Sequence, residues 1–370
     1  MRRTSNPKDN SQRQPEFASS KCVPAESPDN SESVDRLDAL FATAGLVRSL
    51  RGKAGGVTRR MRLERAEPRE LSRATAVPQV ATNGVEWLRV PGWGQPRWLW
   101  HGFSTRRGGV SRAYCPDDVT GELNLGFTAA DSRESVTQNR RLLAEAITGS
   151  ADTALIPIRQ IHSSVLRIAG SSNIASTEPC RGDGLMTSTP GLLLSVQTAD
   201  CIPVLLADRR LRVVAAFHAG WRGTVKRIVE SGVGRMRLEF GSRPEDLIAA
   251  IGPGIGACCY AVGEEVFSSF ESQFTYFEDL FVEVYDSDPV RTKYPMLFLT
   301  QRAPGHSPIG PSLHLDLIEA NRRQLLSAGL GAASIKVLGG CTSCQREVFF
   351  SHRSSKGHAG RMMAVIGIRP

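Results

Sequence analysis

The sequence contains no long apolar run and few aromatic residues, and both shortages restrict what the chain can be. No stretch approaches the roughly 20 uninterrupted apolar residues that a membrane helix needs, so we expect no membrane span. The first 30 residues are polar and lack the apolar core of a secretory signal, which favours a cytoplasmic protein. Aromatic residues make up 6% of the chain, yet four of the five tryptophans lie within residues 87–100, where we expect the folded domain to begin.

A strong excess of one charge sign is also missing from most of the chain. The net charge is +9, but residues 1–80 carry 15 basic and 10 acidic side chains, which leaves only +4 for the other 290 residues. Those residues contain no run of Lys and Arg interleaved with aromatics, so we expect no nucleic-acid partner. Mild positive charge is suited instead to a small substrate that bears phosphate.

The chain divides into a disordered, basic N-terminal extension, residues 1–83, and a folded domain, residues 84–370. Low apolar content predicts disorder in residues 1–35. The spacing of leucines in residues 36–50 predicts a short amphipathic helix. Residues 48–73 hold nine Lys or Arg and three Glu, which fits either an anion-binding segment or a solvated linker.

Apolar runs separated by Gly, Pro and Asp predict a mixed α/β (α+β) domain. Helical periodicity predicts helices over residues 223–240 and 315–328. Residues 268–311 are acidic and rich in Pro and Gly, so we expect a long surface excursion there. The predicted strands are short and run through residues 191–196, 204–207, 212–217, 247–252, 334–338 and 362–368.

Three metal-ligand side chains stand at boundaries between apolar strands and turns: His162, Cys201 and His218. Two imidazoles and one thiolate suit zinc, and three protein ligands leave a fourth position open for catalysis. The spacings of 39 and 17 residues are too loose for a compact zinc finger. The residues alone equally allow a metal-free site in which Cys201 is a nucleophile, His218 its base and Asp200 an orienting group.

The remaining cysteines and a glycine-rich loop give weaker signals. A chain of this size without a secretory signal favours reduced thiols for its eight cysteines. Cys341 and Cys344 form a C-x-x-C pair, which is half of a zinc ribbon or a redox pair. We expect the adjacent Cys258 and Cys259 to be small core residues. The Gly-Pro-Gly-Ile-Gly run at residues 252–256 fits either an anion-binding loop or a tight turn.

Several arginines are candidates for gripping a phosphate or carboxylate. Arg106 and Arg107 stand in a glycine-rich segment, and Arg222 follows His218 by four residues. Arg353, near the C-terminus, is a further candidate, and Arg361 is another. Taken singly, each of these arginines fits a surface role better.

Taken together, these motifs resemble the laccase-domain family of YfiH-like proteins. Its members were long labelled multicopper polyphenol oxidases and are now viewed as purine nucleoside phosphorylases with adenosine deaminase activity. The match runs from about His101 to Ile368, and TADC-x-P and HAGWRG are its most specific parts. The matching segments, in chain order, are HGFSTRRGGVS, NLGF, QIH, GDGLMT, TADCIPVLL, HAGWRGT, IGPGIGACCY, LDL and FFSHR.

The resemblance implies a single compact layered α/β sandwich, related to cysteine-hydrolase-like folds. It implies zinc, rather than copper, held by His162, Cys201 and His218. The implied partners are inorganic phosphate and purine nucleosides, namely adenosine, inosine, guanosine and S-methyl-5'-thioadenosine. The oligomeric state is left open between monomer and homodimer. The older oxidase label fits poorly, because several coppers need more histidine ligands than the seven histidines of the chain supply.

We expect Cys201 and His218 to be catalytic as well as metal-binding. Asp200 is our candidate for moving a proton, and Arg222 for stabilising negative charge. Arg106, Arg107 and Arg353 are the candidates for binding substrate or phosphate. The alternative function is a Cys–His hydrolase or amidase that edits peptidoglycan precursors.

Three positions depart from the pattern usual in the family. Ala261 stands where Glu is usual, His352 where Tyr is usual, and Ser354 where Arg is usual. Any contact to phosphate or ribose that relatives make through those side chains is therefore not carried over to this chain.

Overall fold

The computed structural model describes residues 76–94, 96–115, 121–171, 179–284 and 312–370. All of them belong to one compact unit, which runs from Glu70 to Pro370. The amphipathic helix and the basic segment predicted within residues 36–73 lie outside the described residues. In the part that is described, no helix is long and apolar enough to cross a membrane.

One six-stranded sheet contains the C-terminal strand at its centre, between two antiparallel neighbours. It includes a strand ahead of residue 84, which pairs with the next strand along the chain. Its strands, in spatial order, are β1 (Val77–Val80), β2 (Glu86–Arg89), β3 (Leu99–Ser104), β15 (Met362–Ile368), β8 (Leu192–Thr198) and β5 (Ala154–Pro157).

A second six-stranded sheet contains four of the six predicted strands, those at residues 204–207, 212–217, 247–252 and 334–338. Its central strands are buried along their whole length. Its strands, in spatial order, are β14 (Ile335–Val337), β11 (Leu247–Ile251), β9 (Ile202–Asp208), β10 (Val214–Ala219), β7 (Gly184–Thr187) and β6 (Leu166–Ile168).

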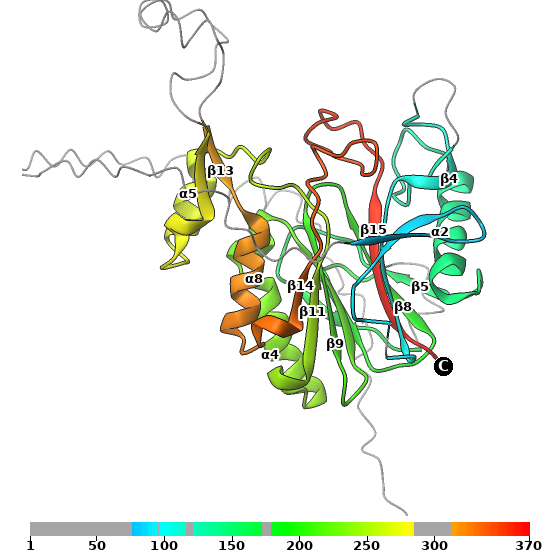
Figure 1. Ribbon diagram of the computed structural model, residues 1–370, viewed down its shortest axis with the longest axis horizontal. Coiled ribbons are helices and arrows are strands. Elements are labelled where there is room, and N and C mark those ends of the chain that lie inside the picture. Colours follow the sequence, from blue (N-terminus) through cyan, green and yellow to red (C-terminus); the bar gives the residue numbers. More distant parts are fainter. Residues whose placement is uncertain (1–75, 95, 116–120, 172–178, 285–311) are drawn as a thin grey trace, which may run out of the picture. The chain divides into compact units, whose positions relative to one another are not determined.

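The two sheets pack face to face with helices on their outer faces (Figure 1). α4 (Ile228–Phe240) and α8 (Leu317–Ser327) cover the second sheet, and α2 (Arg133–Thr148) packs on the first. The order of layers is helix, sheet, sheet, helix, which confirms the expected layered sandwich.

The sequence of strand β10 is apolar throughout because both faces of the strand are buried. Val214 and Ala216 belong to the core between the sheets, whereas Ala215, Phe217 and Ala219 belong to the core under the helices. Successive side chains of a strand point to opposite faces, so a strand that is covered on both sides needs apolar residues at every position.

The helix predicted over residues 223–240 is interrupted. α3 (Trp221–Val225) ends early, and α4 begins after Arg227, whose φ of 55° lies in the left-handed region. The guanidinium of Arg227 stacks on Phe274 and donates to the carbonyl of Gln273. These tertiary contacts stabilise a break that helical periodicity does not reveal.

The prediction of a surface excursion from residue 268 is wrong for its first part. α5 (Glu264–Glu271) is followed by a 3₁₀ turn and by β12 (Phe281–Val284), which pairs with β13 (Ser312–Leu315). Phe270 and Phe274 are buried in the core under the helices, where the ring of Phe270 is tilted against that of Phe274 and packs edge-on against that of Phe281. Residues 285–311 lie outside the described part of the chain.

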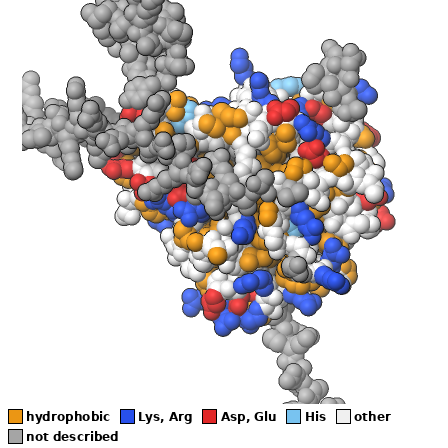
Figure 2. Space-filling model, viewed as in Figure 1, with side chains coloured by type: hydrophobic (Ala, Val, Ile, Leu, Met, Phe, Trp, Pro, Cys, Tyr) orange, Lys and Arg blue, Asp and Glu red, His pale blue; other side chains and the backbone are white. Residues whose placement is uncertain are grey.

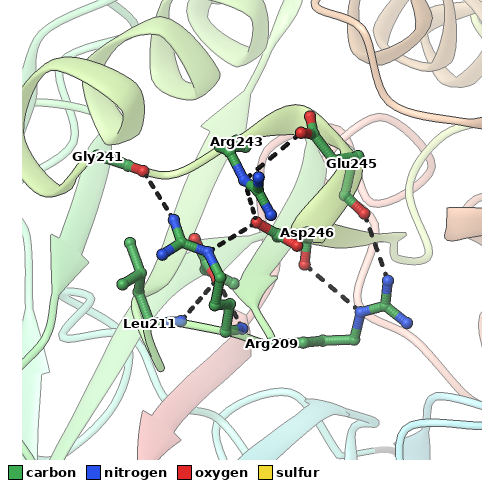
Figure 3. Close-up of polar contacts among 8 residues, drawn as sticks. Arg209, Leu211, Gly241, Arg243, Glu245 and Asp246 are labelled. Atoms are coloured by element: carbon green, nitrogen blue, oxygen red, sulfur yellow. Dashed lines mark hydrogen bonds and ion pairs between the residues drawn. The ribbon is translucent and has the colours of Figure 1, made fainter.

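Charged residues tie the tip of the β9–β10 hairpin to the segment after α4 (Figure 3). Asp246 accepts hydrogen bonds from Arg210 and Arg243, at 2.9 and 2.8 Å. Arg210 also donates to the carbonyl of Gly241. On the face shown in Figure 2, Lys and Arg side chains are scattered among hydrophobic and uncharged residues.

The chain passes from the first sheet to the second between β8 and β9. Only residues 199–201 separate the two strands, and Asp200 has a φ of 92°. Ile255 donates its backbone N–H to the carbonyl of Asp200, so the loop after β11 holds this crossing. The crossing places residue 201 at the end of both sheets.

Candidate metal centre

The structure brings His162, Cys201 and His218 together from three separate elements. Their ligand atoms all lie within 4.8 Å of one another. His162 lies in the loop after β5, Cys201 directly precedes β9, and His218 is near the end of β10. The rings of His162 and His218 meet edge to face at 5.0 Å between centroids.

Burial differs among the three side chains in a way that suits a site open on one side. His218 is buried, Cys201 is half-buried and His162 is exposed. His162 has a φ of 54°, in the left-handed region, so its loop turns sharply there. Three protein ligands with one accessible side match the arrangement of a catalytic metal.

A buried carboxylate organises two of the three candidate ligands. Oδ1 of Asp183 lies 2.9 Å from Nδ1 of His218, and the backbone N–H of His162 also donates to it. Oδ2 accepts hydrogen bonds from the backbone N–H and the hydroxyl of Ser163, at 2.6 and 2.7 Å. This carboxylate fixes the proton of His218 on Nδ1, which leaves Nε2 to face a metal.

The charges of the site shift the pKa values of its members. Burial opposes charge on Cys201, but the charge of His218 and a hydrogen bond from His162 outweigh it and lower the thiol pKa to about 6. Burial also opposes charge on His218, yet Cys201 and Asp183 raise its pKa to about 9. In the metal-free protein the two groups therefore form a thiolate–imidazolium pair near neutral pH.

Glycine is required at position 220 for a steric reason. A Cβ atom there would lie 2.9 Å from Sγ of Cys201 and 3.4 Å from Cδ2 of His162. The backbone of Gly220 has a φ of −71°, which any residue can adopt. The glycine is needed because the backbone passes close to two ligands.

Asp200 is buried beside Cys201, and both of its carboxylate oxygens have partners. The hydroxyl of Thr342 donates to Oδ1 at 2.7 Å, and the backbone N–H of Arg353 donates to Oδ2 at 2.6 Å. Asp200 therefore joins the crossing loop to two C-terminal loops. Its role in moving a proton stays a prediction.

A pocket of about 500 Å³ opens beside the three ligands. Its lining contains both apolar and polar side chains, as in many small-molecule sites. The residues that line it are Ile158, Arg159, Gln160, His162, Gln197, Ala199, Asp200, Cys201, His218, Ile255, Tyr260, Leu317, His352, Arg353 and Arg361.

The predicted arginines are divided between the pocket and other places. Arg353 lines the pocket, where its guanidinium lies over Tyr260 and donates to the carbonyl of Ala261. Arg222 is exposed, stacks on Trp221 and does not line the pocket.

Arg106 and Arg107 also lie outside the pocket lining. The guanidinium of Arg106 forms an ion pair with Glu122 and stacks on Phe350. Arg107 contacts Glu86 and donates to a backbone carbonyl at 3.0 Å. In this structure both side chains are engaged in contacts that support the surrounding strands.

Sequence reasoning missed Asp183 and the glutamine pair of the pocket. Gln160 donates to the carbonyl of Gln197 and accepts from its N–H, at 2.8 and 2.7 Å. Asp183 stands between Gly182 and Gly184 at the start of a buried strand. An acid beside an apolar strand, flanked by glycines, was the available signal for a buried hydrogen-bond acceptor.

The cysteines outside this centre differ from expectation in two respects. Cys258 is exposed and Cys259 half-buried, so their prediction as core residues is wrong; they lie in a turn after β11. Among the described residues, six cysteines are not disulfide-bonded, as expected, but Cys180 is disulfide-bonded. In the glycine-rich segment before Cys258, the N–H groups of Gly252, Ile255 and Gly256 donate to groups within the protein.

Comparison with known proteins agrees with this architecture. The family model described as multi-copper polyphenol oxidoreductase laccase matches residues 100–369. A purine nucleoside phosphorylase from Deinococcus radiodurans is 37% identical over 287 residues, which cover 77% of this chain and 94% of that protein. A protein named adenosine deaminase, from an unknown prokaryotic organism, is 31% identical over 265 residues, covering 70% and 90% of the two chains.

A solved structure shares the fold. The crystal structure of the Bacillus licheniformis hypothetical protein YfiH superposes with a TM-score of 0.63 at 30% identity, covering 76% of this chain and 96% of that chain. Both sequence and structure therefore match over most of the described unit. The chain belongs to the laccase-like polyphenol oxidase family, together with YfiH-type proteins that are named purine nucleoside phosphorylases.

Proposed function

We propose that this protein is a zinc-dependent purine nucleoside phosphorylase with adenosine deaminase activity. The observation that carries the proposal is the convergence of His162, Cys201 and His218 within 4.8 Å at the edge of a pocket. The names of the relatives supply the reaction class. The proposed setting is the cytoplasm, which the six described cysteines without a disulfide support, Cys180 being the exception.

The donor set fits zinc. Two imidazoles and a thiolate are borderline and soft ligands, which zinc accepts in tetrahedral geometry. Asp183 bonds to Nδ1 of His218 and so leaves Nε2 available, and the lowered pKa of Cys201 favours the thiolate that a metal needs. A zinc ion held there supplies Lewis acidity and an activated water for deamination.

The pocket offers positive charge for phosphate. Arg159, Arg353 and Arg361 line it, and guanidinium groups bind phosphate oxygens through paired N–H donors. In phosphorolysis, a phosphate oxygen bonds to C1′ of the ribose while the bond from C1′ to the purine nitrogen breaks. The arginines would orient the phosphate and balance its charge during this step.

The pocket also offers a hydrogen-bond donor for the departing purine. Burial and the charge of Cys201 raise the pKa of Tyr260 to about 12, so its hydroxyl keeps its proton at neutral pH. A neutral phenol can donate to a purine nitrogen on which negative charge develops. Its ring is a flat surface suited to contact with a base.

The test is incubation of purified protein with adenosine, with and without phosphate, and separation of the products by chromatography. Adenine that forms only with phosphate demonstrates phosphorolysis, and inosine demonstrates deamination. The Cys201→Ser variant should lose zinc at the pocket centre and both activities together. Phosphorolysis by a Cys201→Ser protein that holds no zinc at His162 and His218 would contradict the proposal.

One observation favours a second candidate, a Cys–His hydrolase or amidase that acts on peptidoglycan precursors. Cys201, His218 and Asp183 form the chain of nucleophile, base and orienting acid that such enzymes use. This candidate predicts activity on muropeptides that survives chelators and is abolished by alkylation of Cys201. Full inhibition by chelators, reversed by zinc, would exclude it.

A further inference from the structure

Four cysteine side chains outside the pocket meet at one point of the surface. Cys258 and Cys259 contribute from the turn after β11, and Cys341 and Cys344 from the turn after β14. Their four sulfur atoms all lie within 4.8 Å of one another. We refer to these four residues as the thiol cluster.

Sheet topology explains why residues so far apart in sequence meet. β11 and β14 are parallel neighbours, with Ile251 opposite Val337. The carboxyl ends of parallel strands lie at the same sheet edge, so the loops that follow them are adjacent. A parallel bridge between Gly254 and Cys341 continues the pairing into these loops.

The distances within the thiol cluster fit a shared metal better than they fit a disulfide. Sγ of Cys344 lies 3.5 Å from Sγ of Cys258 and 3.3 Å from Sγ of Cys259. Four thiolates at about 2.3 Å from a tetrahedral zinc are about 3.8 Å apart. A disulfide needs about 2.05 Å between sulfurs, and one bridge would leave the other two thiols unused.

The loops also carry features that support bound thiolates. The backbone N–H of Gly256 donates to Sγ of Cys341 at 3.3 Å, a contact that stabilises negative sulfur. Cys341 and Cys344 have the two-residue spacing that a tight turn needs to bring both sulfurs to one metal. Cys258 and Cys344 are exposed, so a metal can enter from solvent.

We propose that Cys258, Cys259, Cys341 and Cys344 bind a second zinc ion as a closed tetrathiolate site. With four protein ligands and no open position, this ion is structural and takes no part in the chemistry of the pocket. Nothing in this proposal depends on the reaction carried out at His162, Cys201 and His218.

The structure indicates what such an ion stabilises. Thr342 lies between the two cysteines of the C-x-x-C turn, and its hydroxyl donates to Asp200 beside Cys201. Its backbone N–H donates to the carbonyl of Gly254. A zinc ion that fixes this turn therefore fixes the residue that supports the crossing loop of the pocket.

The first test leaves the thiol cluster intact. Full-length Cys201→Ser protein, which lacks one ligand of the pocket centre, is purified with zinc and studied by elemental analysis and zinc X-ray absorption. We expect about one zinc per chain, with an all-sulfur first shell at about 2.3 Å. A Cys201→Ser protein that is folded but free of zinc, or whose zinc shell contains nitrogen, would overturn the proposal.

The second test removes the cluster. The Cys341→Ser/Cys344→Ser protein should contain about one zinc per chain with a mixed nitrogen and sulfur shell, against about two for the unchanged protein. Cys115→Ser, at a cysteine outside both groups, is the matched control and should keep about two. A metal-free disulfide among the four cysteines, found by mass spectrometry without reductant, would refute the site.

Discussion

Nδ1 of His218 lies 2.9 Å from Oδ1 of Asp183, and both side chains are buried. The same carboxylate binds the loop that carries His162, through the backbone N–H groups of His162 and Ser163. One acid therefore sets the orientation of one proposed ligand and the position of another. Metal-ligating histidines typically depend on such a partner for their tautomer and basicity.

The Asp183→Asn variant tests this arrangement. An amide cannot accept as many hydrogen bonds, and its NH2 group would face N–H donors, so His218 and the loop of His162 lose their support. We expect zinc affinity at the pocket centre to fall about 10- to 100-fold, measured by competition with a chromophoric chelator.

Asp208→Asn is the matched control for that variant. Asp208 is also fully buried and also accepts backbone hydrogen bonds, but from Arg210 and Leu211 in the β9–β10 turn. It should lower thermal stability without changing zinc affinity. Equal zinc affinity in Asp183→Asn and the unchanged protein would show that Asp183 does not position the ligands.

Gly220→Ala tests the close passage of the backbone beside the ligands. The added methyl would lie 2.9 Å from Sγ of Cys201, so either the thiol or the backbone must move. We expect zinc content and nucleoside turnover to fall together. Gly234→Ala, in α4 with no atom within 4 Å of the new methyl, should leave both unchanged and slightly stabilise the helix.

The reactivity of Cys201 in metal-free protein should follow its lowered pKa. His218 carries a positive charge below about pH 9, and that charge favours the thiolate. The rate at which iodoacetamide alkylates Cys201 should therefore rise with pH, with a midpoint at about 6. Mass spectrometry of the peptide that contains Cys201 measures this rate. Cys115, whose pKa is raised chiefly by burial, provides an internal comparison that should react only at higher pH.

The His218→Gln variant tests whether the charge of His218 lowers the pKa of Cys201. Loss of the imidazolium should shift the alkylation midpoint of Cys201 upward, toward the ordinary range of a thiol. A midpoint that stays near 6 in this variant would show that His218 is not the source of the shift.

Arg353 lines the pocket and Arg107 does not, so we expect their substitution to change KM for phosphate differently. Arg353→Ala removes a guanidinium from the pocket and should raise KM for phosphate on the order of tenfold. Arg107→Ala removes a guanidinium that contacts Glu86 outside the pocket and should leave KM unchanged. Steady-state phosphorolysis at varied phosphate measures both. If Arg107→Ala had the larger effect, phosphate would bind elsewhere.

Local patterns in the sequence predicted much of the second sheet. The apolar runs that became β9, β10 and β11 contain no pattern that indicates another kind of element. Strands that are covered on both faces are apolar throughout. The break at Arg227 and the packed phenylalanines after residue 264 were not predicted. Both depend on contacts with residues distant in sequence, which periodicity does not report.

The sequence by itself determined the chemistry available to the protein: His162, Cys201 and His218, each beside an apolar strand, and motifs specific enough to indicate a family. Only the tertiary structure decided which residues act together. It selected Asp183 as the partner of His218, and it placed Arg353 in the pocket but not Arg106, Arg107 or Arg222. The physical reason is that strand pairing, above all the parallel pairing of β11 and β14, joins residues about 85 positions apart, and no local pattern encodes that distance.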